Sequence, residues 1–348
     1  MDDKKRAALV RRFQAHLANL LPQWPLSTPL LVAVSAGVDS TALLHLLKAC
    51  YPGPLHAAHF DHALRPCSAL DLAHLIEQCQ NNQIKLHHAQ WSPPDHKSNL
   101  AAKARQARYA FLGDVAQQIS APFIAIAHHQ EDQAETMLER LLLRGVGLKG
   151  LRGMRPIAPL PYSNQTTQLL RPLLSLSKSS LTQWLEGERI SWREDPSNQD
   201  LRYTRNRIRH RLIPSLEHVA SPAPLTSRLA QTAEHLQQAD AALNWMTQRL
   251  LEELAPQPWQ EKGVQIPFQP YVDLPTELRA RLLDHWIFSL TGVPSVGHRA
   301  KYNLWQHLQL PAKYWKMNMR GVTIQRAAQY LQIHTQHHAP GKRGETNH

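Results

Sequence analysis

The chain has 348 residues, more than one domain usually contains, and its 43% hydrophobic content is enough for two packed cores. Lysine and arginine (39) exceed aspartate and glutamate (27) by 12, which favours a polyanionic partner and does not bear on the fold. The three cysteines, Cys50, Cys67 and Cys79, have no C-x-x-C spacing, which disfavours a zinc ribbon, a redox pair or a disulfide framework and suits a reducing compartment.

The N-terminal end is charged and lacks the apolar stretch of a signal peptide. The most apolar segment, residues 30–50, is interrupted by polar side chains and falls short of the ~20 apolar residues that a membrane span needs. We therefore expect a cytoplasmic protein that has no membrane partner.

Short apolar runs alternate with longer segments of helical periodicity over the first 143 residues. The runs that predict buried strands are residues 30–34, 55–59, 84–89 and 123–127. The segments that predict helices are residues 41–49, 68–81, 99–120 and 132–143. This alternation predicts a parallel α/β sheet, whose ligands bind at the carboxyl ends of the strands.

The chain beyond residue 143 is first rich in glycine and arginine and then in proline. A further strand or extended segment is expected at residues 169–174, and helices are expected at residues 177–188 and 226–254. The region up to Leu331 is predicted to be helical with loops. The expected organisation is an α/β domain at 1–215, a mainly helical second domain at 216–335, and a disordered tail at 336–348.

The sharpest motif, S-A-G-V-D-S, follows the first strand and opens a helix. Its residues are Ser35, Ala36, Gly37, Val38, Asp39 and Ser40. Small residues let backbone N–H groups approach an anion, hydroxyl groups donate hydrogen bonds, and the helix N-terminus adds partial positive charge. The motif therefore predicts a phosphate-binding loop, although it is not a Walker A loop. An ordinary strand-turn-helix with a polar cap is the alternative.

This motif resembles the S-G-G-x-D-S pyrophosphate loop of the N-type ATP pyrophosphatases, which split ATP into AMP and pyrophosphate. The resemblance implies that the first domain binds ATP. Asp39 lies where a carboxylate suits Mg²⁺ bound to the phosphates. Ala36 replaces a glycine of the family pattern, which is tolerable at negative φ and costly at positive φ.

Further blocks, in chain order, resemble the tRNA(Ile)-lysidine synthetase family. They are residues 59–65, 104–109, 127–136, 144–154, 194–198 and 203–209. The resemblance implies a two-step reaction on an isoleucine tRNA with a CAU anticodon. ATP adenylates the C2 carbonyl oxygen of the wobble cytidine, and the ε-amine of free L-lysine then displaces AMP. Activation is needed because a carbonyl oxygen is a poor leaving group, whereas AMP leaves readily.

Asp132 and Glu135 lie three residues apart on one helix face, where two carboxylates can hold an ammonium group. A solvated acidic first turn, favoured by the helix dipole, is the alternative. By resemblance these acids and Arg108 form the lysine pocket, with the guanidinium group matching the lysine carboxylate and the acids matching its α-amine. Arg105 is the alternative to Arg108, and His129 is counted with the catalytic residues.

The densest basic run, residues 202–211, suits contact with a phosphodiester backbone. Arg205, Arg207 and Arg211 are the expected RNA contacts, and Arg209 is left as a structural residue. A solvated helix face is the alternative for this run.

The literal G-x-G-x-x-G at residues 145–150 follows a helix rather than a strand, so it is not a dinucleotide-binding fingerprint. We expect a flexible loop there, with Arg144, Lys149 and Arg152 able to approach ATP or RNA. In the second domain, most of the tryptophans are expected in the core, and Tyr314 to Lys316 form an aromatic and basic candidate for RNA contact.

Other functions stay open at this point. A tRNA thiolase of the same ATP class would need catalytic or cluster-binding cysteines. A non-enzymatic basic RNA-binding protein with a vestigial nucleotide loop would account for Ala36 and for Glu131, where the family usually has aspartate. The sequence also leaves a homodimer open.

Overall fold

The computed structural model of the chain describes residues 2–22, 27–62, 68–92, 99–144, 147–163, 166–194, 199–219, 224–259, 262–293, 295–319 and 321–335. The chain divides into two compact units, Met1–Gln237 and Gln238–His348. The expected tail at 336–348 lies outside the described residues, as do residues 195–198 of one family block. Domain limits at residues 215 and 335 stay a prediction.

A six-stranded sheet forms the centre of the first unit, in the order β3-β2-β1-β4-β6-β5. The strands are β1 (Leu30–Val34), β2 (Leu55–Asp61), β3 (Lys85–Gln90), β4 (Phe123–Ala125), β5 (Ile157–Pro159) and β6 (Gln168–Leu170). All neighbouring pairs are parallel except β5 with β6. The chain runs outward from β1 to β3 and returns to β4 on the other side of β1. The strand order therefore reverses between β1 and β4, and ligands bind at such a point in open α/β sheets.

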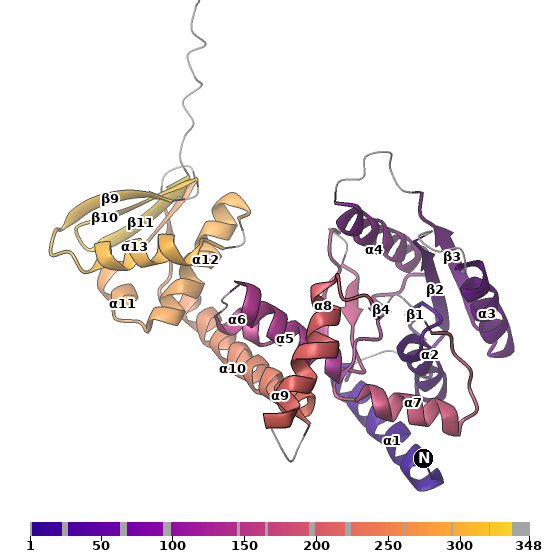
Figure 1. Cartoon of the computed structure of the whole chain (residues 1–348). Coiled ribbons are helices and arrows are strands. Elements are labelled where there is room, and N and C mark those ends of the chain that lie inside the picture. Colours follow the sequence, from indigo (N-terminus) through magenta and orange to yellow (C-terminus); the bar gives the residue numbers. More distant parts are fainter. Residues whose placement is uncertain are drawn as a thin grey trace, which may run out of the picture. The chain divides into compact units, whose positions relative to one another are not determined.

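Helices cover both faces of this sheet (Figure 1). The longer helices of the first unit are α1 (Asp3–Leu20), α2 (Val38–Cys50), α3 (Ser68–Asn81), α4 (Leu100–Gln118), α5 (Gln130–Arg144) and α7 (Lys178–Gly187), and the unit ends within α10 (Leu225–Glu253). The shorter ones are α6 (Leu148–Leu151), α8 (Thr204–Arg207), the π-helix η2 (Ile208–Leu212) and α9 (Ile213–Val219).

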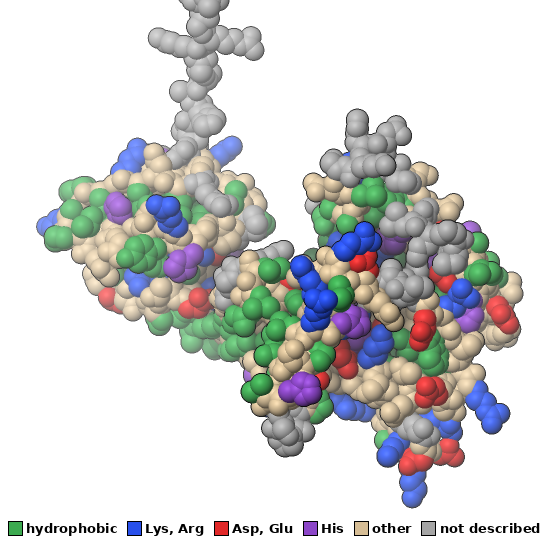
Figure 2. All heavy atoms as spheres, viewed as in Figure 1, with side chains coloured by type: hydrophobic (Ala, Val, Ile, Leu, Met, Phe, Trp, Pro, Cys, Tyr) green, Lys and Arg blue, Asp and Glu red, His purple; other side chains and the backbone are tan. Residues whose placement is uncertain are grey.

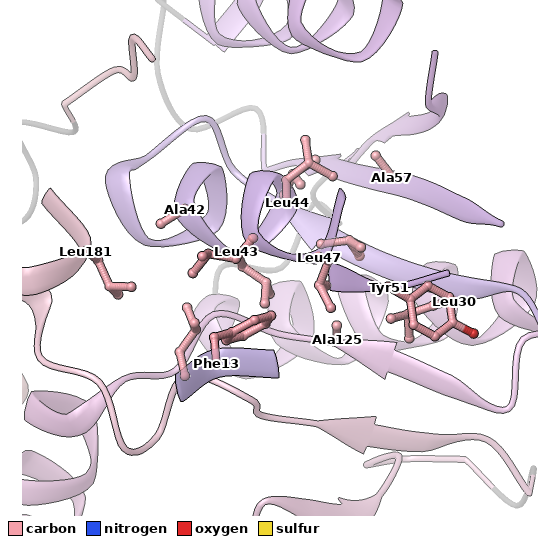
Figure 3. Close-up of a cluster of buried hydrophobic side chains, with 14 of the residues drawn as sticks. Phe13, Leu30, Ala42, Leu43, Leu44, Leu47, Tyr51, Ala57, Ala125 and Leu181 are labelled. Atoms are coloured by element: carbon pink, nitrogen blue, oxygen red, sulfur yellow. The ribbon is translucent and has the colours of Figure 1, made fainter. Parts of the chain in front are cut away.

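Two hydrophobic clusters lie on opposite faces of the sheet. On one face, α1, α2 and α7 pack against alternate residues of β1, and Phe13 and Leu181 meet α2 there (Figure 3). On the other face, α4 packs Tyr109 and Leu112 against Leu31. Because successive side chains of a strand point to opposite faces, the continuous apolar run of β1 supplies both clusters.

The predicted α/β fold class is confirmed, with strands and helices close to their expected limits. The flexible loop expected after α5 is wrong for its described part, because residues 148–151 form α6. The Gln133 side chain donates to the Met154 carbonyl (3.0 Å) and accepts from the Met154 backbone N–H (2.7 Å). Arg140 Nη1 donates to the carbonyls of Gly150 and Gly153, both at 2.9 Å. Side chains of α5 thus fix this segment.

The second unit combines helices with an antiparallel sheet in the order β7-β8-β11-β10-β9. Besides the end of α10, it contains α11 (Phe268–Val272), α12 (Thr276–Thr291), α13 (His298–Leu308), β7 (Gln257–Pro258), β8 (Gly263–Pro267), β9 (Tyr314–Met319), β10 (Val322–Ala327) and β11 (Tyr330–Thr335). The expected helical region is confirmed by α10, α12 and α13, but the expectation of helices and loops alone is wrong for β8 to β11. Gln265, Gln325 and Gln332 stand among the apolar residues of β8, β10 and β11, and they weaken the apolar signal.

One core holds the second unit together, and Trp286 lies within it at 2% exposure. Trp305 and Trp315 are partly buried against this core, whereas Trp245 is 60% exposed. The tryptophan prediction therefore holds only in part. Within the described ranges of both units, no helix is long and apolar enough to cross a lipid bilayer.

Candidate active site

Two loops meet at the point where the strand order reverses. The loop 35–37 connects β1 to α2, and residues 126–129 connect β4 to α5. Since β1 and β4 are parallel neighbours, with Leu31 paired to Ile124, both loops leave the same edge of the sheet. The predicted phosphate loop and the predicted catalytic block are therefore brought together.

The phosphate loop leaves the start of α2 open to a ligand. Gly37 is the N-cap residue and has no side chain to cap the helix. The Ser40 hydroxyl group accepts from the Ser35 backbone N–H and donates to the Gly37 carbonyl, both at 3.1 Å. The first N–H groups of a helix lack partners within the helix, and they attract anions when no side chain caps them. This geometry suits a phosphate group.

Ala36 adopts the conformation that disfavours a side chain. Its φ is 62° and its side chain is fully buried. An L-residue in the left-handed region costs about 1–2 kcal/mol, so an alanine at this position stores strain in the loop. The Ala36 carbonyl accepts from the Arg193 backbone N–H at 3.0 Å and from the Thr41 hydroxyl group at 3.4 Å. These two contacts hold the loop in place.

His129 links the phosphate loop to the start of α5. Its Nε2 lies 3.5 Å from Asp39 Oδ2 and 3.4 Å from Asp132 Oδ2, and its Nδ1 lies 2.9 Å from Glu131 Oε2. Burial by itself lowers the pKa of His129, but hydrogen bonds to Asp39 and Glu131 and the charge of Asp132 outweigh it and raise the pKa to about 10. His129 is therefore a buried cation at neutral pH.

Glu131 has a structural role. Its two carboxylate oxygens accept from the Lys178 backbone N–H, at 2.9 and 3.1 Å, where α7 begins. Burial opposes ionisation, but the hydrogen bonds from His129 and from this N–H lower the pKa of Glu131. The carboxylate thus joins the first turn of α5 to the N-terminus of α7.

Asp132 and Glu135 face two arginines of the basic run. Arg205 donates to Glu135 Oε2 and to Asp132 Oδ1, both at 2.7 Å. Arg209 donates to Glu135 Oε1 at 2.6 Å and to Glu135 Oε2 at 3.0 Å, and approaches Asp132 Oδ1 at 3.4 Å. Burial opposes ionisation of Asp132, but the charges of His129 and Arg205 lower its pKa. Sequence reasoning missed these partners, although Arg205 and Arg209 are spaced to share a helix face.

Arg108 lies apart from the acid pair. Its guanidinium group stacks on the Tyr109 ring at 5.0 Å, as that of Arg105 does, and its Nε atom is buried with no hydrogen-bond partner. Among the described residues, no hydrogen bond or ion pair joins Arg108 to Asp132 or Glu135. The predicted lysine pocket is therefore only partly assembled by direct contacts.

A cavity of about 610 Å³ opens beside the acid pair. Glu131, Glu135 and Arg209 line one side of it, and Lys178 and Glu186 line the α7 side. Free amino acids are small enough to enter a space of this size. On the face shown in Figure 2, basic side chains gather over α8 with acidic side chains beside them.

Arg207 and Arg211 line a second, smaller groove of about 390 Å³ on the basic run. Both are exposed, as an RNA-contacting residue must be. Arg205, expected with them, turns its guanidinium group toward the carboxylates instead.

One atom of the phosphate loop lacks a partner. Asp39 Oδ1 is buried and accepts no hydrogen bond. Among the described residues, no group of three or more His, Cys, Asp or Glu side chains is arranged to hold a metal ion. Mg²⁺ commonly takes one or two carboxylates and completes its coordination with phosphate oxygens and water, so this single free oxygen fits such an ion only together with a nucleotide.

Comparison with known proteins places these features in a family. The sequence pattern of a family described as "PP-loop domain" matches residues 9–216. The tRNA(Ile)-lysidine synthase of Novosphingobium aromaticivorans is 37% identical over 264 residues, which are 75% of this chain and 76% of that protein. That of Zymomonas mobilis is 33% identical over 283 residues, covering 81% of this chain and 82% of that protein.

Other relatives are longer than the part they share with this chain. The tRNA(Ile)-lysidine synthase of Geobacter sulfurreducens is 38% identical over 234 residues, which are 64% of this chain but 46% of that protein. Among solved structures, the U34-tRNA thiolase NcsA from Methanococcus maripaludis matches with a TM-score of 0.54 and 14% identity, covering 67% of this chain and 80% of that one. This likeness concerns the fold alone.

Proposed function

Because the chain belongs to the tRNA(Ile)-lysidine synthase family of PP-loop proteins, we propose that it joins lysine to an isoleucine tRNA at the expense of ATP. The bond forms at C2 of the wobble cytidine in the CAU anticodon, through an adenylated tRNA, and the products are lysidine, AMP and pyrophosphate. The observation that carries this proposal is that His129 contacts both Asp39 of the phosphate loop and Asp132 of the predicted lysine pocket.

ATP binds with its phosphates at the N-terminus of α2, where Gly37 leaves the backbone N–H groups uncapped. Asp39 presents its free oxygen to Mg²⁺, which neutralises phosphate charge when bound. His129, a buried cation, holds Asp39 in position and adds positive charge near the phosphates. The hydroxyl groups of Ser35 and Ser40 complete the loop.

Lysine binds at the start of α5, with Asp132 and Glu135 accepting hydrogen bonds from its α-ammonium group and Arg108 facing its carboxylate. The α5 acids lie at the same edge of the sheet as the phosphate loop, which brings the amino acid to the carbon that ATP activates. Lysine amines have a reference pKa of about 10.4, so the attacking amine must lose a proton before it displaces AMP.

The RNA lies over the exposed arginines of the basic segment. Arg207 and Arg211 contact phosphate groups, and the second unit adds further contacts to the tRNA. Unstacked anticodon bases are a usual target for sequence-specific reading. A cytoplasmic location and a homodimer stay predictions.

The decisive assay is incubation of the full chain with ATP, labelled lysine and total tRNA. We expect label in one isoleucine tRNA, and pyrophosphate release that requires tRNA. Asp39→Asn should nearly abolish pyrophosphate release while tRNA affinity stays close to that of the wild type. Asp114→Asn, an exposed change on α4, is the matched control. If the wild-type protein transfers no lysine to any tRNA, the proposed function is wrong.

A further inference from the structure

All four carboxylate oxygens of Asp132 and Glu135 are engaged. Both oxygens of Glu135 and Oδ1 of Asp132 accept hydrogen bonds from Arg205 and Arg209. Asp132 Oδ2 accepts from the His129 backbone N–H at 3.0 Å. Two carboxylates and two guanidinium groups also balance in charge. A lysine ammonium group therefore finds neither a free oxygen nor an excess of negative charge at these acids.

A guanidinium group resembles an ammonium group in the properties that a carboxylate recognises. Both are cations with several N–H donors, and both form charge-assisted hydrogen bonds. Arg205 reaches both acids at 2.7 Å, so it lies where the proposed function places the substrate cation. One arginine must withdraw before lysine can bind there.

Arg205 is the one better placed to withdraw. Its side chain is 40% exposed, against 26% for Arg209. It lies in α8, a helix of four residues, whereas Arg209 follows Ile208, which is buried against Leu138 of α5. Breaking the Arg205 pairs therefore exposes less buried surface and disturbs less packing than moving Arg209 does.

The arginine side chains of residues 205–211 point in two directions. Arg205 and Arg209 point to the acids, whereas Arg207 and Arg211 are exposed and line the second groove. A phosphodiester backbone bound at the groove offers Arg205 an alternative anion within the same segment. RNA binding can thus bias the position of Arg205 without any contact to lysine.

We propose that Arg205 is a latch that occupies the lysine site in the absence of tRNA and leaves it when tRNA binds. Lysine then binds after tRNA, and free lysine is not held by an enzyme that has no RNA to modify. This inference rests on the proposed function. By linkage, tRNA must tighten lysine binding by the same factor by which lysine tightens tRNA binding.

The test is equilibrium dialysis of labelled lysine against the full chain without ATP, in the presence and absence of unmodified isoleucine tRNA. Wild-type protein should bind lysine about tenfold or more tightly when tRNA is present, because the competent state is then populated. Arg205→Gln should bind lysine without tRNA as tightly as the wild type does with tRNA, and adding tRNA should change little. Arg202→Gln is the matched control, because Arg202 lies in the same segment but pairs with Asp200. This control should respond to tRNA as the wild type does.

Melting temperatures identify a folding defect, and Arg205→Lys, which keeps the charge, serves if Arg205→Gln is unstable. That variant should bind lysine without tRNA more tightly than the wild type, because an ammonium group donates fewer hydrogen bonds to the two acids. Unchanged or weaker lysine binding in a folded Arg205 variant overturns the latch. Such a result leaves lysine transfer by the wild type intact, whereas absence of that transfer refutes the proposed function itself.

Discussion

The free energy of unfolding should depend on pH because His129 is a buried cation. The pKa of His129 is about 10 in the folded chain, against 6.5 for an unperturbed histidine. Below pH 6.5 the side chain is protonated in both states, so the stabilisation by its carboxylate partners is fully present. Between the two values the unfolded chain releases a proton that the folded chain keeps, and stability falls as pH rises.

The slope is about 1.4 kcal/mol per pH unit for one proton. From pH 6.5 to about pH 9, the His129 contribution to the free energy of unfolding should therefore fall by about 3 kcal/mol. His129→Gln removes this titration and keeps a side chain that can donate a hydrogen bond. The wild type should lose this stabilisation on the alkaline side, whereas the variant should not.

Urea unfolding of both proteins at about pH 6 and about pH 9 measures the effect. Urea is preferred to guanidinium chloride because it does not screen the ion pairs. Other titrating groups cancel in the difference between the two proteins. A wild-type minus variant difference that is the same at both pH values would refute a charged, carboxylate-bound His129.

Three further outcomes are expected. Ala36→Gly should change the free energy of unfolding by less than about 1 kcal/mol, since relief of left-handed strain offsets the lost methyl burial and the greater entropy of the unfolded chain. Ala36→Val should lower the free energy of unfolding by more than about 2 kcal/mol in urea unfolding. Gly153→Ala should cost about 2–3 kcal/mol in the same assay, because φ is +66° and a Cβ would lie 2.6 Å from Gln133 Oε1; a neutral result contradicts that packing. Replacing both Arg207 and Arg211 with Gln should reduce the slope of log affinity against log salt concentration by about one unit per lost phosphate contact, for cognate and non-cognate tRNA alike. An unchanged slope would mean that these two arginines are solvated surface residues without phosphate contacts.

Local signals predicted the sheet and the phosphate loop. The run at β1 is apolar at every position, and the small residues after it mark both the turn and the helix start. The sequence could show that an alanine at position 36 is tolerable at negative φ and costly at positive φ. It could not predict which sign of φ Ala36 adopts. In the fold the Ala36 carbonyl accepts from the backbone N–H of Arg193, which is far away in the chain and leaves no local sequence signal.

The partners of the basic run could not be predicted. A charged segment has the same sequence pattern whether it is solvated or ion-paired, and Glu135 lies 70 residues from Arg205. The second sheet has only a weak signal in the sequence, because the alternation of Val322 and Ile324 with Thr323 and Gln325 spans one short strand. A period of two over six residues is easily lost beside longer helical patterns.

Glu131 contacts both His129 and the Lys178 backbone N–H at the start of α7, so the residue type that fits at position 131 depends on where α7 lies. An aspartate at this position would be one methylene shorter, so it could not keep both the His129 contact and the Lys178 contact with the backbone where it lies. A replacement of Glu131 by Asp would thus keep both contacts only together with a shift of α7. Epistasis of this kind means that chimaeras should exchange the first turn of α5 and the start of α7 as one block.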